Sequence, residues 1–221
     1  MADARVRLGM VGGGQGAFIG GVHRIAARID DRYELVAGAL SSKPDVAKAS
    51  ADELHIAPDR SYASYEEMFA AEAKREDGIE AVAIVTPNHM HFPVAKAALE
   101  AGINVICDKP VTRTLEEALE LEQICAKSDA FFALTHNYSA YPLVRYAREM
   151  VERGDLGQVR LVQVEYPQEW LTQAPEEDNK QAAWRTDPKR SGKAGCLGDI
   201  GTHAFQLATF ISQLELDSVS A

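Results

Sequence analysis

Short apolar runs alternate with segments of helical periodicity over the first 136 residues, and this alternation restricts the fold more than any other feature. The apolar runs are 6–11, 33–40, 81–86, 103–107 and 131–135. Candidate helices lie between them at 17–29, 44–54, 65–74, 90–101 and 114–128. Strands that are apolar throughout and separated by helices are typical of a parallel sheet covered on both faces. We therefore predict an α/β fold with a doubly wound parallel sheet at 1–136.

The segment GGGQGA begins at Gly12, directly after the first apolar run, and fits the pattern G-x-G-x-x-G/A. Gly12 would allow a tight turn, Gly14 the approach of a pyrophosphate, and Ala17 close contact between helix and strand. The phosphates would bind the free N–H groups that open the following helix. Strand, turn and helix occur in the required order, so we predict a dinucleotide site that also includes Gln15 and Gly16; an ordinary glycine-rich loop is the alternative.

The end of the second apolar run bears on the choice between NAD and NADP. An acidic residue there would bind the ribose 2′-hydroxyl of NAD, whereas this chain has Ser41, Ser42 and Lys43. Hydroxyls and a cation suit a 2′-phosphate, and no carboxylate repels it. The segment therefore favours NADP over NAD, with a solvated turn as the alternative.

Polar turns follow the third and fourth apolar runs. Thr86, Pro87 and Asn88 follow the third, and Asp108 and Lys109 follow the fourth. The carboxyl ends of parallel strands meet at one edge of a sheet, where ligands bind in open α/β folds. A lysine there could hydrogen-bond a hydroxyl or stabilise an alkoxide; a lysine that merely reaches solvent is the alternative.

Asp199 and His203 are four residues apart in a helix predicted at 199–212 and would share one face. A carboxylate beside an imidazole can fix the tautomer of the imidazole and tune its basicity for proton transfer near neutral pH. The pair is therefore a candidate acid–base group, although such pairs are also found in purely structural roles.

A different pattern follows residue 136 and indicates a second domain at 137–221. We predict a helix at 141–153 and an alternating strand at 159–166. The polar segment 167–195 is too long for an ordinary connection, which indicates a functional loop.

Charge and cysteine content exclude several classes of protein. The net charge is −10 and no basic cluster is present, which argues against binding to nucleic acid or anionic membranes. No apolar run is long enough for a membrane helix, and the N-terminus lacks a signal-peptide pattern. The three cysteines show no metal-binding spacing, so we expect no metal, and free thiols indicate a cytoplasmic protein.

The glycine-rich turn, the segment TPNHMH, the triplet DKP and the segment GDIGTH together resemble the Gfo/Idh/MocA oxidoreductases over essentially the whole chain. The resemblance implies an N-terminal Rossmann domain and a C-terminal α/β domain with a mostly antiparallel sheet. It also implies oxidation of a sugar or polyol hydroxyl by NAD or NADP, or reduction of the corresponding carbonyl.

The resemblance also implies roles for single residues. The family lysine corresponds to Lys109, its helix aspartate to Asp199 and its acid–base histidine to His203, all three also touching substrate. Substrate contacts are further expected at Tyr141, Trp184 and Arg185. The cofactor would be bound by His91 and by the residues of the polar and glycine-rich turns: Gly12, Gly14, Gln15, Gly16, Ala17, Ser41, Ser42, Lys43, Thr86, Pro87, Asn88, Asp108 and Lys109.

Two departures from the family pattern bear on these expectations. Asp108 replaces the usual glutamate, and the family continues with further strands beyond the position of Ala221. We therefore expect an incomplete second domain, less stable beyond about residue 155. We also expect a homo-oligomer for a full-length form but not for this chain.

Two other functions share the fold: a glycosidase that uses tightly held NAD, and a non-catalytic dinucleotide-binding regulator. The joint presence of Lys109, Asp199 and His203 argues against the regulator, which needs no acid–base residues. The identity of the sugar or polyol stays open.

Overall fold

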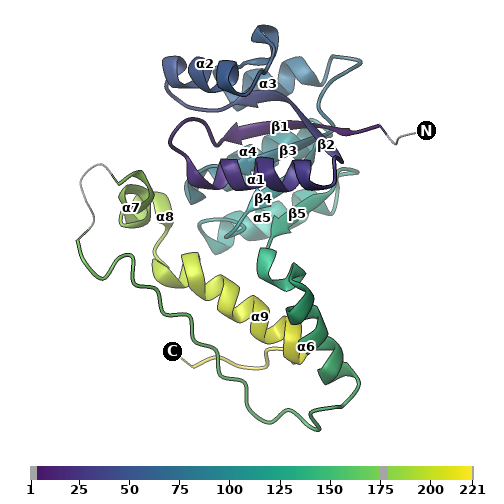
Figure 1. Cartoon of the computed structure of the whole chain (residues 1–221), viewed down its shortest axis with the longest axis vertical. Helices are drawn as coiled ribbons and strands as arrows, with labels where there is room; N and C mark the ends of the chain where they lie inside the picture. Colours follow the sequence, from purple (N-terminus) through teal and green to yellow (C-terminus); the bar gives the residue numbers. More distant parts are fainter. Residues whose placement is uncertain (1–3, 175–178, 221) are drawn as a thin grey trace.

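The computed structural model describes residues 4–174 and 179–220. Its sheet has five parallel strands in the order β2-β1-β3-β4-β5 (Figure 1). The strands are β1 (Val6–Gly12), β2 (Tyr33–Ala39), β3 (Ala81–Val85), β4 (Asn104–Asp108) and β5 (Phe132–Thr135). The chain adds β2 on one side of β1 and β3 on the other, so the strand order reverses beside β1. The predicted doubly wound α/β fold is confirmed.

Each predicted helix of this part is present within a few residues of its expected bounds. The helices are α1 (Phe18–Ile29), α2 (Pro44–Glu53), α3 (Tyr65–Glu72), α4 (His91–Glu100) and α5 (Leu115–Cys125). Helix α5 begins at a capping box, in which Thr114 Oγ1 accepts from the Glu117 N–H and the Glu117 carboxylate accepts from the Thr114 N–H. Both otherwise unpaired donors are thereby satisfied. None of the helices in the described ranges is long and apolar enough to cross a membrane.

The core lies on both faces of the sheet. Every residue of β3 is buried. Val82 and Ile84 pack in a cluster with Val94 of α4, whereas Ala83 packs with Met10 in a second cluster. Successive side chains of a strand point to opposite faces, so these alternating residues supply both clusters. The sheet is therefore a rigid, buried platform whose carboxyl edge can hold a site.

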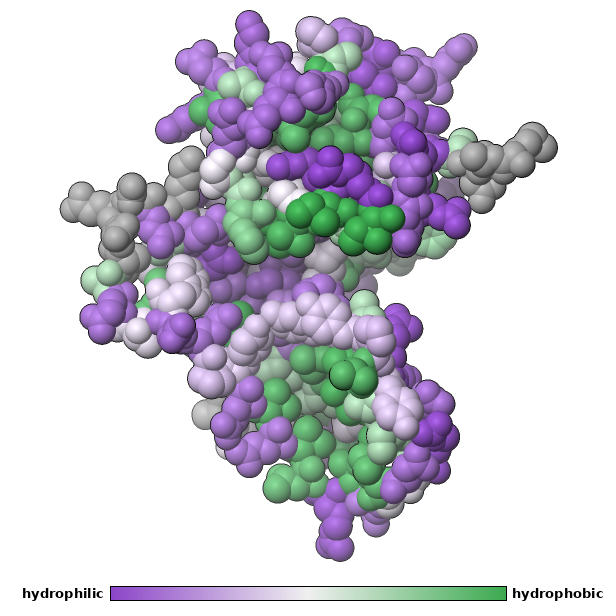
Figure 2. Space-filling model, viewed as in Figure 1, coloured by the Kyte–Doolittle hydropathy of each residue, from purple (hydrophilic) through white to green (hydrophobic). Residues whose placement is uncertain are grey.

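Helix α1 lies in front of the sheet, with α4 behind it (Figure 1). An apolar stripe on α1 faces solvent and appears as a green patch in Figure 2. Its residues, Phe18, Val22, Ile25 and Ile29, are 42 to 74% exposed. Their spacing places them on one side of the helix, away from the sheet. No other element among the described residues covers this stripe.

The regular elements in the described second part of the chain are all helical. They include α6 (Pro142–Glu152), α7 (Lys180–Arg185), α8 (Pro188–Ser191), the π-helical turn η4 (Leu197–Gly201) and α9 (Thr202–Ser212). Helices α6 and α9 pack side by side below the sheet (Figure 1). The Arg148 guanidinium of α6 donates to the Phe210 carbonyl of α9 at 3.2 Å and lies over the Phe210 ring.

The prediction of a strand at 159–166 is wrong for this structure. The segment has no regular secondary structure, and its apolar residues Leu161, Val162 and Val164 are exposed. A strand requires a neighbouring strand for its backbone donors and acceptors, and the described residues form only the five-stranded parallel sheet. The predicted functional loop at 167–195 includes residues 175–178, which lie outside the described residues, and α7 and α8 form within the rest of it.

Candidate active site

A cavity of about 1120 Å³ extends from between α1 and the sheet, where Leu8, Ala27 and Tyr33 line it, past the carboxyl edge of the sheet to the second part of the chain. It is larger than the roughly 300–1,000 Å³ usual for small-molecule sites, which suits a dinucleotide together with a substrate. Most predicted site residues line it: Gly14, Gln15, Gly16, Ala17, Ser41, Ser42, Lys43, Thr86, Pro87, Asn88, Asp108, Lys109, Tyr141, Trp184, Arg185 and His203. Gly12, His91 and Asp199 do not line it.

The glycine-rich turn after β1 has a conformation that other residues rarely adopt. Gly12, Gly13 and Gly16 have φ values of 80°, 75° and 76°. A Cβ on Gly14 would lie 2.7 Å from the Ser50 hydroxyl and 2.8 Å from the Leu40 carbonyl oxygen. The turn is therefore pressed against the end of β2 and against α2, and any side chain at Gly14 would disturb the protein itself.

The sequence pattern predicted that α1 packs most closely on this turn at Ala17, but the closest contact is at Gly20. A Cβ on Gly20 would lie 2.4 Å from the Gly13 Cα. Ala17 is instead the N-cap of α1 and lines the cavity. The small residue that permits close packing of helix and turn is thus one helical turn further along.

The amide groups of the turn fit a phosphate. The Gly14 and Gln15 N–H groups donate within the protein, to the Leu40 carbonyl and to the Ser50 hydroxyl. The N–H groups of Gly16 and Phe18 form no hydrogen bond in the described part of the chain, and the first turn of α1 has no acidic residue. Unpaired donors at a helix N-terminus attract anions. The geometry therefore suits the pyrophosphate of a dinucleotide.

The turn after β2 is cationic. Ser41, Ser42 and Lys43 all line the cavity, and the Ser41 hydroxyl accepts from the Lys43 N–H at 3.1 Å. Of the described lining residues, only Asp108 contributes a carboxylate, and it belongs to the turn after β4. The end of the cavity at β2 therefore has no negative side chain.

His91 does not contact the cavity, contrary to expectation. It is buried, and its Nδ1 and Nε2 lie 2.7 Å from the Pro110 carbonyl oxygen and 3.0 Å from the Thr86 carbonyl oxygen. Burial lowers the pKa of His91, so the ring is neutral and donates to one of the two carbonyls. His91 therefore lies between the turns after β3 and β4 and contacts the backbone of both.

Lys109, Asp199 and Arg185 form a charge network. The Lys109 ammonium donates to Asp199 Oδ1 and to the Asp199 carbonyl oxygen, at 2.7 Å each, and Arg185 Nε donates to Oδ2 at 2.9 Å. Although burial opposes ionisation, the Lys109 and Arg185 contacts hold the pKa of Asp199 below its usual value. The Asp199 carboxylate is therefore charged, and it fixes the Lys109 ammonium at the cavity wall.

The expectation that Asp199 orients His203 is wrong for this structure, in which no hydrogen bond joins the two side chains. Asp199 belongs to the π-helical turn η4, whose wider spacing changes the i, i+4 relation expected for an α-helix. Its carboxylate oxygens are occupied by Lys109 and Arg185. Asp199 therefore positions Lys109, and its side of η4 faces a smaller cavity of about 350 Å³.

His203 is buried at the start of α9 beside two aromatic rings. Its ring centroid lies 4.6 Å from that of Tyr138 and 5.7 Å from that of His136. Burial and the nearby Lys109 charge, with a smaller contribution from His136, lower the pKa of His203 to about 4. His203 Nδ1 has no hydrogen-bond partner in the described part of the chain. His203 is therefore a neutral imidazole at pH 7, able to accept a proton.

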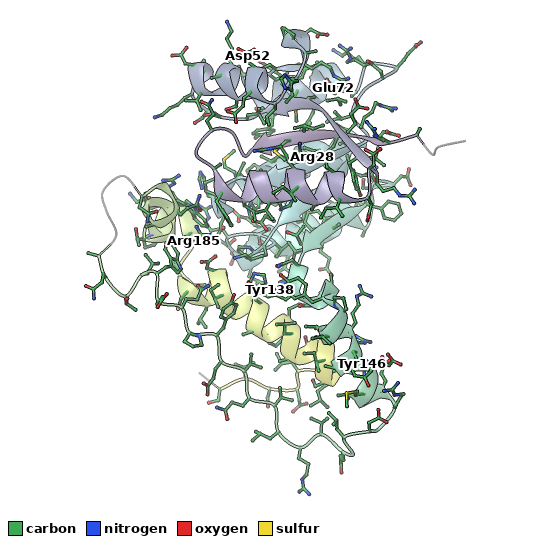
Figure 3. All side chains as sticks on the ribbon, in the orientation of Figure 1. Arg28, Asp52, Glu72, Tyr138, Tyr146 and Arg185 are labelled. Carbon is green, nitrogen blue, oxygen red and sulfur yellow. The ribbon has the colours of Figure 1, made fainter. Side chains whose placement is uncertain are left out.

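The segment after β5 supplies residues that the sequence analysis did not single out. The Tyr138 hydroxyl lies 2.6 Å from the Tyr166 hydroxyl, and this hydrogen bond with burial raises the pKa of Tyr138 to about 12. Figure 3 shows Tyr138 and Arg185 near the upper end of α9, below the sheet. The available signal was position, because this segment follows a strand at the same edge as Lys109. Other lining residues that were missed are His23, Thr135, Asn137, Gln168, Gln181 and Arg190.

Comparison with known protein families gives two adjacent matches. Residues 6–136 match "Oxidoreductase family, NAD-binding Rossmann fold", and residues 144–221 match "GFO/IDH/MocA C-terminal domain". A protein of Bacillus subtilis, "Uncharacterized oxidoreductase YfiI", is 38% identical over 93% of this chain and 53% of its own length. The chain thus spans about half the length of the curated relatives it matches.

Solved structures show the same likeness. An oxidoreductase from Sinorhizobium meliloti is 56% identical with a TM-score of 0.84, over 97% of this chain and 54% of that one. An inositol dehydrogenase homologue from Azotobacter vinelandii, complexed with NAD⁺, is 38% identical with a TM-score of 0.92, over 95% of this chain and 54% of that one. The same homologue with NADH and myo-inositol is 36% identical, with a TM-score of 0.87 over 95% and 53%.

Proposed function

The chain belongs to the Gfo/Idh/MocA oxidoreductase family, and from this premise we propose that it carries the cofactor site and acid–base residues of an NAD(P)-dependent sugar or polyol dehydrogenase. Residues 1–136 form its dinucleotide domain, and 137–221 form part of its substrate domain. The observation that carries the proposal is that Lys109 and His203 line the same cavity as the glycine-rich turn. The N–H groups that suit a phosphate and the acid–base residues Lys109 and His203 therefore share one cavity.

His203 is the proton acceptor in this proposal. Its imidazole is neutral at pH 7 because its pKa is about 4, so it can take the proton of a substrate hydroxyl. A bound nicotinamide ring would supply the hydride acceptor for the same carbon. After the step His203 is a cation in a buried, positively charged setting, which favours prompt loss of the proton.

Lys109 holds the reacting oxygen. An ammonium at the cavity wall hydrogen-bonds the substrate hydroxyl and stabilises the negative charge that grows on its oxygen. Asp199 keeps this ammonium in place through two 2.7 Å contacts, one from its carboxylate and one from its carbonyl. Asp199 is therefore a positioning residue for Lys109 rather than for His203.

The substrate end of the cavity suits a molecule rich in hydroxyl groups. Tyr141, Trp184 and Arg185 line it, and the Arg185 guanidinium lies 4.2 Å from the Trp184 ring centroid. An aromatic face fixed by a cation presents an apolar surface beside hydrogen-bond donors, which matches the two sides of a sugar or polyol ring. The complex of a relative with myo-inositol agrees with this substrate class.

The cofactor preference in this proposal is NADP, bound at its 2′-phosphate by Ser41, Ser42 and Lys43. The cellular location that we propose is the cytoplasm. Cys107, Cys125 and Cys196 are all free thiols in the structure, as a reducing compartment would allow.

Hydride transfer measured against a panel of sugars and polyols tests the proposal, on this chain and on any longer product of its gene. We expect cofactor reduction by at least one substrate, lowered about 10²- to 10⁴-fold in His203→Asn with NADH affinity unchanged. The matched control is His55→Asn, since His55 is exposed and is not among the described residues that line the cavity. Undiminished turnover in His203→Asn would remove His203 from the mechanism.

A further inference from the structure

The cavity is positively charged in a protein whose net charge is −10. The cationic residues among its described lining are Lys43, Lys109, Arg185 and Arg190, against the single carboxylate of Asp108. Lys109 and Arg185 are both paired with Asp199. The charges of Lys43 and Arg190 therefore remain, and Arg190 has no role in the function proposed above.

The backbone around Arg190 is held firmly against the sheet. Asp187 caps α8, its carboxylate accepting from the Lys189 N–H at 2.9 Å. The Asn88 amide, from the turn after β3, donates to the Ser191 carbonyl at 3.0 Å, and Arg113 donates to the Lys189 carbonyl at 3.1 Å. Both bonds reach the residues on either side of Arg190. Helix α8 is thus fixed to the turn beside the predicted cofactor site.

Arg190 is half-buried and lines the cavity, and its guanidinium forms no hydrogen bond or ion pair within the described ranges. A cationic side chain that lines a cavity and has no partner in the protein is available to pair with an anionic ligand. The planar fork of donors matches a phosphate, which it can contact through two hydrogen bonds at once. The side chain and its surroundings therefore favour a phosphate ligand.

We infer that Arg190 binds the diphosphate of the dinucleotide, reaching it from the second part of the chain, opposite the glycine-rich turn. The inference rests on the proposed function. Gly16 and Phe18, whose N–H groups have no partner among the described residues, line one wall of the cavity. Arg190 lines the wall formed by α8. A diphosphate held between them joins α8 to α1. Cofactor binding then orders the substrate side of the cavity as well as the cofactor side.

Calorimetric titration of the chain with NAD⁺ and with adenosine tests this inference, because adenosine lacks the phosphates. Arg190→Gln is expected to weaken NAD⁺ binding by at least about tenfold, since a charge-assisted hydrogen bond is lost, and to leave adenosine binding unchanged. Arg190→Lys retains the charge without the fork and is expected to fall between wild type and Arg190→Gln. Amide hydrogen exchange at 180–191 should slow on adding NAD⁺ to the wild type only.

The matched control is Lys189→Gln, which removes the same charge from the neighbouring, exposed position and should bind both ligands as wild type. Equal NAD⁺ affinity in wild type and Arg190→Gln overturns the inference and leaves the proposed function standing. Parallel losses of NAD⁺ and adenosine binding also overturn it, because they indicate a structural defect. If a sugar phosphate titrated in parallel binds Arg190→Gln more weakly while NAD⁺ does not, Arg190 contacts the substrate, and the inference is overturned. A wild-type chain that binds neither NAD⁺ nor NADP⁺ overturns the proposed function itself.

Discussion

Lys109 and Asp199 are 90 residues apart in the chain and meet at the cavity wall, where one ammonium contacts both the carboxylate and the backbone carbonyl of the aspartate. Lys109 follows β4, and Asp199 lies in the π-helical turn before α9. The contact therefore joins the carboxyl edge of the sheet to the helix that carries His203. The same ammonium also lowers the pKa of His203, so one residue both holds the site together and sets its protonation state.

Lys109→Met should raise the pKa of His203 from about 4 toward its unperturbed value of about 6.5. Removing a nearby positive charge makes protonation of the imidazole easier, although burial, the larger cause, continues to oppose it. An NMR titration of the histidine ring protons measures the change. Lys48→Met, at an exposed position on α2, is the control and should leave the titration unaltered. An unmoved pKa in Lys109→Met would mean that burial alone sets the value.

The free energy of unfolding should fall as the pH is lowered from about 7 to 5. Burial lowers the pKa values of His91, His136 and His203, so the folded state binds fewer protons than the unfolded chain in this interval. The loss begins as the pH drops below the unfolded value near 6.5 and continues toward the folded values. Each histidine that stays neutral on folding contributes up to about 1.4 kcal/mol per pH unit.

Urea denaturation at several pH values measures this dependence. His203→Asn removes one of the contributing groups and should flatten the profile, whereas exposed His55→Asn should not. Stability that is constant from pH 7 to 5 would show that the folded protein binds as many protons as the unfolded chain, and so that burial does not lower these pKa values.

Gly20→Ala should destabilise the protein strongly, and Gly21→Ala should stabilise it. A Cβ on Gly20 would lie 2.4 Å from the Gly13 Cα, so α1 must move away from the turn. At Gly21 the nearest group is the end of the Arg24 side chain at 3.9 Å, and alanine in a helix is favoured by about 0.5–1 kcal/mol. Thermal unfolding of both variants, with NAD⁺ titration, makes the comparison. Equal stability of the two would contradict the close packing of helix and turn.

Lys43→Ala should weaken NADP⁺ binding about tenfold or more and leave NAD⁺ binding nearly unchanged. The lysine lines the end of the cavity formed by β2, where a 2′-phosphate would lie, and no ion pair of its ammonium is found among the described residues. Lys48→Ala, at an exposed position on α2, the helix that Lys43 precedes, is the matched control. If NAD⁺ is strongly preferred and Lys43→Ala changes neither affinity, this turn does not contact the ribose.

The sheet and its helices could be predicted from the sequence because their signals are local. Each strand, such as β3, is apolar throughout, and each helix has its own periodicity or cap, as at Thr114. The turns that line the cavity could be predicted as well, because every parallel strand ends at the same edge. Lys109 and Asn88 were found by that reasoning alone.

The rest depends on contacts between distant segments. The alternation at 159–166 signals a strand, but a strand forms only beside a partner, which the described residues do not supply. Asp199 lies in a π-helical turn and contacts Lys109 and Arg185, and helical periodicity in the sequence encodes neither the turn nor these contacts. The positions of His91 behind the cavity and of Arg190 within it likewise depend on how the turns pack on one another.

Energy transfer from tryptophan to NADH tests most directly whether the cavity is a cofactor site that joins both parts of the chain. The protein has two tryptophans, Trp184 in the cavity wall and Trp170 at the adjoining smaller cavity. We expect NADH to quench tryptophan emission saturably, at one site per chain, with sensitised nicotinamide emission that falls sharply in Trp184→Phe. Unquenched emission from a folded chain at high concentrations of both NADH and NADPH would contradict the account.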